Sequence, residues 1–221
     1  MLGWRALRAA TEIHEAAMEY RKALENRCRN PHLVDRLDGL APSFHAHELA
    51  AARTAYLTYR RVVPAPIREW QRNTVGLGEP GMARLLGHLG HPAWRWVYRW
   101  DDTRGEHVLI DSGPRSFGQL VAYAGLVPGR AKRKGMTAED AMALGNQRVG
   151  PVLHSIAESA GVKNTASIYR VVYDDARAVY DATDVKPIVS HMRALRLVKR
   201  EILRDLWLVA CSTLDGERMT R

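Results

Sequence analysis

The sequence predicts a mainly α-helical protein with one small β-hairpin. Three observations support this fold class: long segments in which apolar residues recur every three or four positions, one short segment in which they alternate, and glycines and prolines between these segments. A chain of 221 residues is long enough to bury a core in one domain or in two small ones. We expect a helical pair over residues 1–72 and a second domain over residues 73–221.

Two long helices are expected in the first domain. Residues 4–28 are rich in Ala, Glu, Arg and Leu, and Asn30-Pro31 then breaks the chain. Ser43 can cap a second helix that runs over residues 44–62. The apolar stripe of the first helix consists of Leu7, Ala10, Ile13, His14, Ala17 and Leu24. That of the second helix consists of Leu49, Ala52, Tyr56 and Tyr59.

Such a pair is an antiparallel helical hairpin that is similar to a coiled coil. Its apolar stripes are narrow, and two interpretations stay open. Either residues 4–62 pair with a second copy of the chain, which makes the protein a homo-oligomer, or they pack only on the C-terminal part of their own chain.

A tight turn that opens onto a helix is expected at residues 74–86. Gly76 and Gly78 permit positive φ angles, and Pro80 suits the first helical turn because its missing N–H costs nothing there. The apolar face of this helix consists of Met82, Leu85, Leu86 and Leu89. Such a turn directs free N–H groups outward, which is a phosphate-binding geometry. We interpret it as a helix-hairpin-helix motif; the alternative is a plain turn.

Residues 91–113 differ from the rest because aromatic and other residues alternate. Aromatic side chains occupy every second position from Trp94 to Trp100, which is the period of a strand. The polar turn 101–105 leads to an apolar segment, Val108-Leu109-Ile110, so a β-hairpin is expected. Its aromatic face can stack on nucleic-acid bases or pack against the core, and both interpretations stay open.

Further helices are expected after this hairpin. Ser116 and Gln119 form a capping box, Thr137 and Asp140 can cap another helix, and Ser167 caps a third. A concentrated basic loop contains Arg130, Lys132, Arg133 and Lys134. The last helix, residues 188–211, is amphipathic, and its basic side consists of Arg193, Arg196, Lys199, Arg200 and Arg204.

The composition favours a polyanionic partner. The chain has 33 Lys and Arg residues against 24 Asp and Glu residues, which gives a net charge of +9. Two cysteines make no disulfide framework, so the reducing cytoplasm is the expected location. No apolar run approaches the ~20 residues that span a bilayer, so no membrane association is expected.

Four short motifs follow one another in residues 70–211. They are Val75-Gly76-Leu77-Gly78 through Leu86, Phe117 to Pro128 with Ala122-Tyr123-Ala124-Gly125-Leu126 at its centre, Gly145-Asn146-Gln147-Arg148, and a final helix from His191 to Trp207. In this order they resemble the C-terminal half of transposases of the insertion-sequence-110 family. The helical pair before them resembles the coiled-coil segment that joins the two halves of such transposases.

The resemblance also shows what the chain lacks. Such transposases begin with a RuvC-like domain that supplies four metal-binding carboxylates, but residues 1–72 show no strands with spaced acidic residues. They also carry a serine nucleophile after the Ala-Gly-Leu-X-Pro motif, whereas residues 129–146 contain no serine and one hydroxyl, that of Thr137. Ser112 and Ser116 precede the motif. We therefore expect no metal site, no cofactor and no complete catalytic site; Thr137 is the remaining candidate nucleophile.

The sequence thus predicts a nucleic-acid-binding protein, and the resemblance implies that it acts in DNA transposition or recombination. Its partner would be DNA, or a structured RNA, held by contacts to backbone phosphates. The candidate binding residues are Gly76, Gly78, Gly81, Arg84, Arg130, Lys132, Arg133, Lys134, Arg148, Arg193 and Arg196. Two alternatives stay open: an active recombinase subunit that a RuvC-like partner completes, and a structural homodimer.

Overall fold

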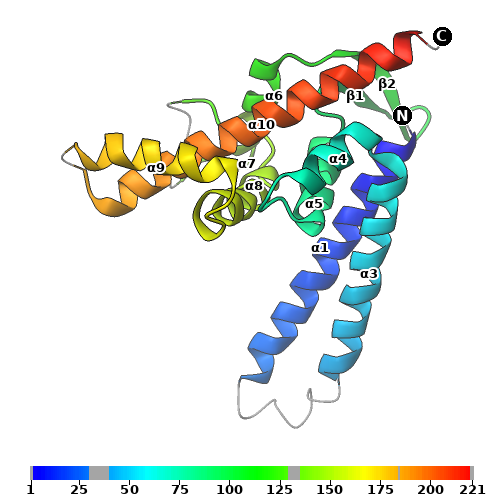
Figure 1. Cartoon of the computed structure of the whole chain (residues 1–221). Coiled ribbons are helices and arrows are strands. Elements are labelled where there is room, and N and C mark those ends of the chain that lie inside the picture. Colours follow the sequence, from blue (N-terminus) through cyan, green and yellow to red (C-terminus); the bar gives the residue numbers. More distant parts are fainter. Residues whose placement is uncertain (1, 30–39, 129–134, 184, 220–221) are drawn as a thin grey trace.

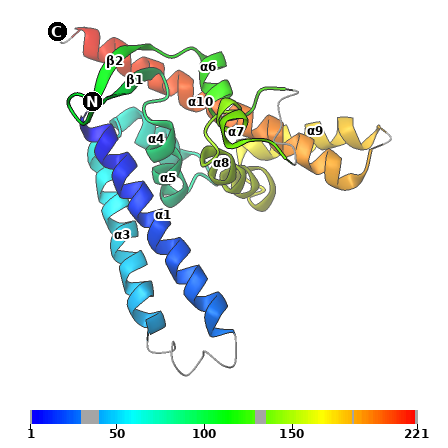
Figure 2. The same cartoon turned by 180° about the vertical axis from the view of Figure 1, so that it is seen from behind.

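The computed structural model of this chain describes residues 2–29, 40–128, 135–183 and 185–219. This part of the chain is mainly helical and contains one two-stranded antiparallel sheet, which confirms the predicted fold class. Figures 1 and 2 show a central body from which the pair α1–α3 projects in one direction, while α9 and the adjoining part of α10 extend in another.

The projecting pair consists of the two long helices that the sequence predicts. Helix α1 spans Leu2–Cys28 and α3 spans Ala41–Val62. The side chains that they bury are Leu7, Ala10, Thr11, His14 and Leu24 on α1, and Ala52, Ala55, Thr58 and Tyr59 on α3. Far from the body, Arg21 of α1 forms an ion pair with Glu48 of α3.

The predicted apolar stripes of this pair are wrong at two positions. Ile13 is 62% exposed and Leu49 is 57% exposed. The buried face of α1 includes Thr11 and not Ile13, because α1 packs on α5 as well as on α3. The approach is close: a methyl group added at Gly87 of α5 would lie 2.1 Å from Thr11 Oγ1.

The start of α3 also differs from the prediction. The helix begins at Ala41, and the hydroxyl of Ser43 donates a hydrogen bond to the carbonyl of Leu40 instead of capping the helix. Pro42 occupies the first turn, where its missing N–H leaves no bond unmade. Helix α4, Ala65–Asn73, likewise has a proline in its first turn.

Helix α5 spans Glu79–Leu89, and the turn 74–78 joins it to α4. All four residues of its predicted apolar face are buried, and none is more than 2% exposed. The predicted order of helix, Gly-X-Gly turn and helix is therefore present.

The β-hairpin is present as predicted. Strands β1, Trp94–Asp101, and β2, Glu106–Pro114, pair antiparallel with an irregularity between Val97 and Tyr98. Helix α6, Phe117–Tyr123, follows, and the capping box of Ser116 and Gln119 is confirmed at its start. The short helix α7 spans Ala138–Ala143.

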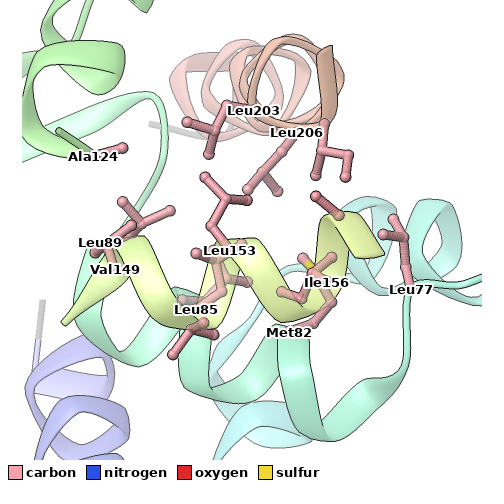
Figure 3. Close-up of a cluster of buried hydrophobic side chains, with 14 of the residues drawn as sticks. Leu77, Met82, Leu85, Leu89, Ala124, Val149, Leu153, Ile156, Leu203 and Leu206 are labelled. Carbon is pink, nitrogen blue, oxygen red and sulfur yellow. The ribbon is translucent and has the colours of Figure 1, made fainter. Parts of the chain in front are cut away.

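The C-terminal part of the chain completes the core. Its elements are α8 (Val149–Glu158), the π-helical turn η2 (Ser159–Lys163), α9 (Ile168–Asp181) and α10 (Pro187–Met219). Ser167 caps α9, as predicted. Figure 3 shows how Leu153 and Ile156 of α8 lie between Met82 and Leu85 of α5 on one side and α10 on the other.

The hydrophobic core extends across residue 72. Leu7, Tyr59 and Ile67 belong to the same cluster of buried side chains as Leu85 and Leu203. The division of the chain into two domains at this point stays a prediction. Of the helices in the described ranges, not one contains an apolar stretch that could cross a membrane.

Candidate nucleic-acid interface

The turn 74–78 is held in place by its own surroundings. The side-chain amide of Gln71 donates a hydrogen bond of 2.6 Å to the carbonyl of Leu77, and the hydroxyl of Tyr59 lies 3.4 Å from Gln71 Oε1. Gly76 has a φ of 89°, and a methyl group there would lie 2.5 Å from the Cα atom of Ala160. The lack of a side chain at Gly76 therefore allows the turn to lie close to η2.

The N-terminal end of α5 already carries a negative charge. Gly78 caps the helix and is exposed, and the first helical residue is Glu79. The Arg60 guanidinium donates to both carboxylate oxygens of Glu79, at 2.6 and 2.8 Å, and holds the pKa of this carboxyl below its usual value. Gly81 packs on α8, where a methyl group would lie 3.0 Å from Ile156 Cγ1. A phosphate at this end of the helix would meet the Glu79 carboxylate.

Two of the predicted binding arginines are paired with acids of α1. Arg84 Nη2 lies 3.1 Å from Glu15 Oε1, and Arg148 Nη1 lies 3.3 Å from Glu12 Oε1. Burial acts to raise the pKa of Glu15, but its interactions with His88 and Arg84 outweigh this and lower the pKa. The guanidinium of Arg84 therefore faces the helical pair.

Three arginines of α10 gather at one hollow. Arg193, Arg196 and Arg200 lie three and four positions apart, so they share one face of the helix, and all three line a hollow of about 340 Å³. The rest of its lining is Leu126, Pro128, Tyr180 and Leu197. No acidic residue lines it among the residues that the structure describes.

The positions of these arginines are fixed by different contacts. Arg196 Nη2 donates to the carbonyls of Leu126 and Val127, at 3.1 and 2.7 Å. The guanidinium carbon of Arg193 lies 5.7 Å from the centre of the Tyr180 ring. These contacts hold two positive charges at the hollow without neutralising them.

The two other basic residues on this side of α10 differ from the three arginines. Lys199 is partly buried, and burial, with Arg196 nearby, lowers its pKa. Arg204 forms ion pairs with Glu201 and Asp205. The spacing of Arg193 and Arg196 identified their common face from the sequence. The contributions of Tyr180 and of the Leu126 carbonyl were missed, because no local pattern connects them with α10.

Five further candidates lie apart from this hollow or outside the described ranges. Arg130, Lys132, Arg133 and Lys134 are outside the residues that the structure describes. Thr137 caps α7: its hydroxyl accepts a hydrogen bond from the Asp140 amide at 3.1 Å and donates to the Asp140 carboxylate at 2.8 Å. In the described ranges, no group of three or more His, Cys, Asp and Glu side chains is placed to hold a metal ion.

No protein-family model matches the sequence, and no curated protein matches it significantly. The functional argument therefore depends on the residues themselves.

Proposed function

We propose that this protein binds nucleic acid through backbone phosphates, and that the hollow lined by Arg193, Arg196 and Arg200 is the main contact. The observation that carries this proposal is that three arginines line one hollow that no carboxylate of the described residues lines. Arginine donates in a fork that fits phosphate oxygens, and phosphate contacts do not depend on base sequence. The net charge of +9 adds a long-range attraction.

The biological setting that we propose is DNA transposition or recombination in the cytoplasm. Support comes from the resemblance of residues 70–211 to the C-terminal half of insertion-sequence-110 transposases. In this proposal the chain holds DNA, or a structured RNA, and carboxylates for strand cleavage come from a separate RuvC-like partner. In this proposal Thr137 serves as a helix cap, a role supported by the two hydrogen bonds that its hydroxyl forms with Asp140.

We also infer that the chain self-associates through the projecting pair α1–α3. Ile13 and Tyr20 of α1 are 62% and 66% exposed, and Leu49 and Leu57 of α3 are 57% and 56% exposed. Four large apolar side chains on one projecting element favour a protein contact over contact with water. A second copy would bury them and bring two arginine-lined hollows into one assembly.

A salt series tests nucleic-acid binding. Fluorescence anisotropy with unrelated duplexes and a four-way junction should show weak sequence preference and a steep loss of affinity with salt. Replacement of Arg193, Arg196 and Arg200 by Gln should weaken binding at least ~10-fold and reduce the salt slope by roughly three, because each neutralised phosphate contributes nearly one to it.

A charge-matched variant provides the control. Arg53, Arg61 and Arg72 are exposed residues of α3 and α4, and their joint replacement by Gln removes the same three charges. This variant should lose much less affinity. Equal losses in the two triple variants would show that net charge acts without a defined site. Binding that salt does not weaken would contradict the proposal as a whole.

A further inference from the structure

A second cavity lies between the first turns of α1, the C-terminal end of α5 and the β-hairpin. Its volume is about 130 Å³. Arg5 and Arg8 of α1 and Arg115, which follows β2, contribute positive charges to its lining, and His88 and His91 contribute imidazoles. Among the described residues, no Asp or Glu lines it.

Arg115 is the least exposed of the three arginines. Its Nη1 donates to the carbonyl of Leu89 at 3.1 Å, and its guanidinium carbon lies 5.1 Å from the centre of the Tyr123 ring. The Asp111 carboxylate on the hairpin is 2.7 Å from Arg95, and Arg115 forms no ion pair within the described ranges. Burial of a charge without a counter-ion destabilises the fold, so an anion in the cavity would offset this cost.

The hydroxyl of Tyr98 is the second unusual group of this cavity. It is buried and has no hydrogen-bond partner among the described residues, although the Tyr98 side chain lines the cavity. Arg5 lies over the other part of this side chain, with its guanidinium carbon 5.2 Å from the ring centre. Buried hydroxyls almost always have a partner, so this hydroxyl lacks an acceptor that a ligand in the cavity would supply.

We propose that this cavity binds a small oxyanion of the phosphate type, with the Arg115 guanidinium as its counter-ion and the Tyr98 hydroxyl as a hydrogen-bond donor. Arg5 and Arg8 are exposed, and Arg5 adds positive charge around the site, whereas Arg8 lies 3.6 Å from the Glu12 carboxylate. The same chemistry comes from two sources, free inorganic phosphate and the terminal phosphate of a nucleic acid. The site is formed by other residues than the hollow of α10, so it does not depend on the function proposed above.

Thermal unfolding in the presence of inorganic phosphate tests this site, with ionic strength held constant by chloride. Because the ligand binds only the folded chain, phosphate should raise the Tm in a saturable way, by several degrees at about 100 times the Kd. Trp4 and Trp96 line the cavity, so their fluorescence gives a second readout of the same titration.

Tyr98→Phe is the decisive variant. The Tyr98 hydroxyl has no hydrogen-bond partner in the folded chain, so its removal should leave the fold intact. The affinity for phosphate should fall about 10-fold, because the variant lacks this hydrogen-bond donor. Tyr20→Phe is the matched control, because Tyr20 is 66% exposed on α1 and far from the cavity lining. Arg115→Met should abolish the phosphate effect; if that variant does not fold, Tyr98→Phe still decides the question.

Two oligonucleotides distinguish the sources. A single strand with a 5′-phosphate that binds better than the same strand without it, with the preference lost in Tyr98→Phe, identifies a nucleic-acid end as the ligand. Equal binding of both strands together with the phosphate-dependent Tm identifies a free oxyanion. The proposal is overturned if phosphate up to tens of millimolar gives no saturable change, or if Tyr98→Phe and Tyr20→Phe bind it equally. The triple Gln variant of α10 should keep the phosphate response.

Discussion

The side-chain amide of Asn146 donates a hydrogen bond of 3.0 Å to the hydroxyl oxygen of Tyr123. Both groups also donate to the carbonyl of His88, each at 3.2 Å, and the backbone amide of Asn146 donates to the carbonyl of Tyr123 at 2.7 Å. A methyl group at Gly145 would lie 2.6 Å from the carbonyl oxygen of Ala122. Two of the motifs that carry the family resemblance therefore contact each other and the end of α5.

Asn146→Ala should destabilise the fold by roughly 1–3 kcal/mol, because it leaves the Tyr123 hydroxyl and the His88 carbonyl with fewer partners in a partly buried site. Urea unfolding followed by circular dichroism measures the change. Asn73→Ala, at an exposed position near the end of α4, should change stability by less than about 0.5 kcal/mol. Similar effects of the two replacements would contradict this role of Asn146.

Gly76→Ala should cost more than Gly105→Ala, although both glycines have positive φ angles, 89° and 62°. Each replacement strains the backbone by about 1–2 kcal/mol. A methyl group at Gly76 would also lie 2.5 Å from the Cα atom of Ala160, whereas nothing lies within 4 Å at Gly105. We expect a total of about 3 kcal/mol or more at Gly76, measured by the same unfolding experiment. Equal losses of stability in the two variants would contradict the close packing of the turn 74–78 on η2.

The stability of the fold should fall between pH 6.5 and pH 4. Burial, with help from the charge of Arg115, lowers the pKa of His91 to about 4. Below pH 6.5 the unfolded chain therefore takes up a proton at this residue that the folded chain takes up only near pH 4. The stability that His91 contributes is fully present above pH 6.5, falls by roughly 3 kcal/mol between pH 6.5 and pH 4, and changes no further below pH 4.

His91→Asn tests this assignment, because asparagine does not titrate but can keep the hydrogen bond that His91 Nδ1 accepts from the Ala93 amide at 3.1 Å. The variant should lose less stability than the original chain between pH 7 and pH 4.5 in urea unfolding. His14 and His154 also have lowered pKa values, mainly through burial. Their effect on the pH dependence of stability is the same in the original chain and in the variant. An identical pH dependence of the two proteins would refute the role of His91.

The projecting helices should mediate self-association. Light scattering at tens of micromolar should show a dimer, and Ile13→Lys with Leu49→Lys should weaken it at least ~10-fold, since each change places a charge where about 1.5–3 kcal/mol of apolar burial is expected. The control is Val171→Lys with Val179→Lys on α9, where the valines are 61% and 65% exposed. A monomeric original chain would exclude this proposal, and so would equal disruption by the control pair.

The isolated chain should not nick supercoiled plasmid in the presence of Mg²⁺ or Mn²⁺. Metal-assisted cleavage needs a cluster of ligands, and the described residues contain no group of three or more that is placed to hold an ion. Thr137→Ala should lower stability by about 1 kcal/mol, as expected for a lost helix cap. Nicking that disappears in Thr137→Ala but persists in Ser112→Ala and Ser116→Ala would establish the enzyme alternative.

Most features that depend on neighbours in sequence could be predicted, and the cap expected at Ser43 was the exception. The capping residues Ser116 and Ser167 were identified correctly because a cap involves only the next two or three residues. The buried face of α5 was also correct, because it follows from helical period alone. For the same reason, the common face of Arg193 and Arg196 was visible in the sequence.

Features that depend on distant partners could not be predicted. The exposure of Ile13 follows from the contact of Thr11 with Gly87, which lies 76 positions further along the chain. Arg84 looked available for phosphate because nothing local pairs with it, whereas its partner Glu15 lies 69 positions away. The positively charged cavity around Arg115 is lined by segments that lie far apart in the sequence, and no single stretch of sequence contains its pattern.

The ion pair between Arg84 and Glu15 also limits where α1 is anchored. Beyond Glu15 the helix continues for 13 residues to Cys28, which is roughly 20 Å of helix axis, and Figure 1 shows this part standing clear of the body. A length of 20 Å corresponds to about six base-pair steps of duplex DNA at 3.4 Å each. If two copies meet through this part of their helices, its length sets the distance between the two DNA segments that the copies hold. Lengthening or shortening α1 by whole helical turns should then change that distance in steps of about 5 Å.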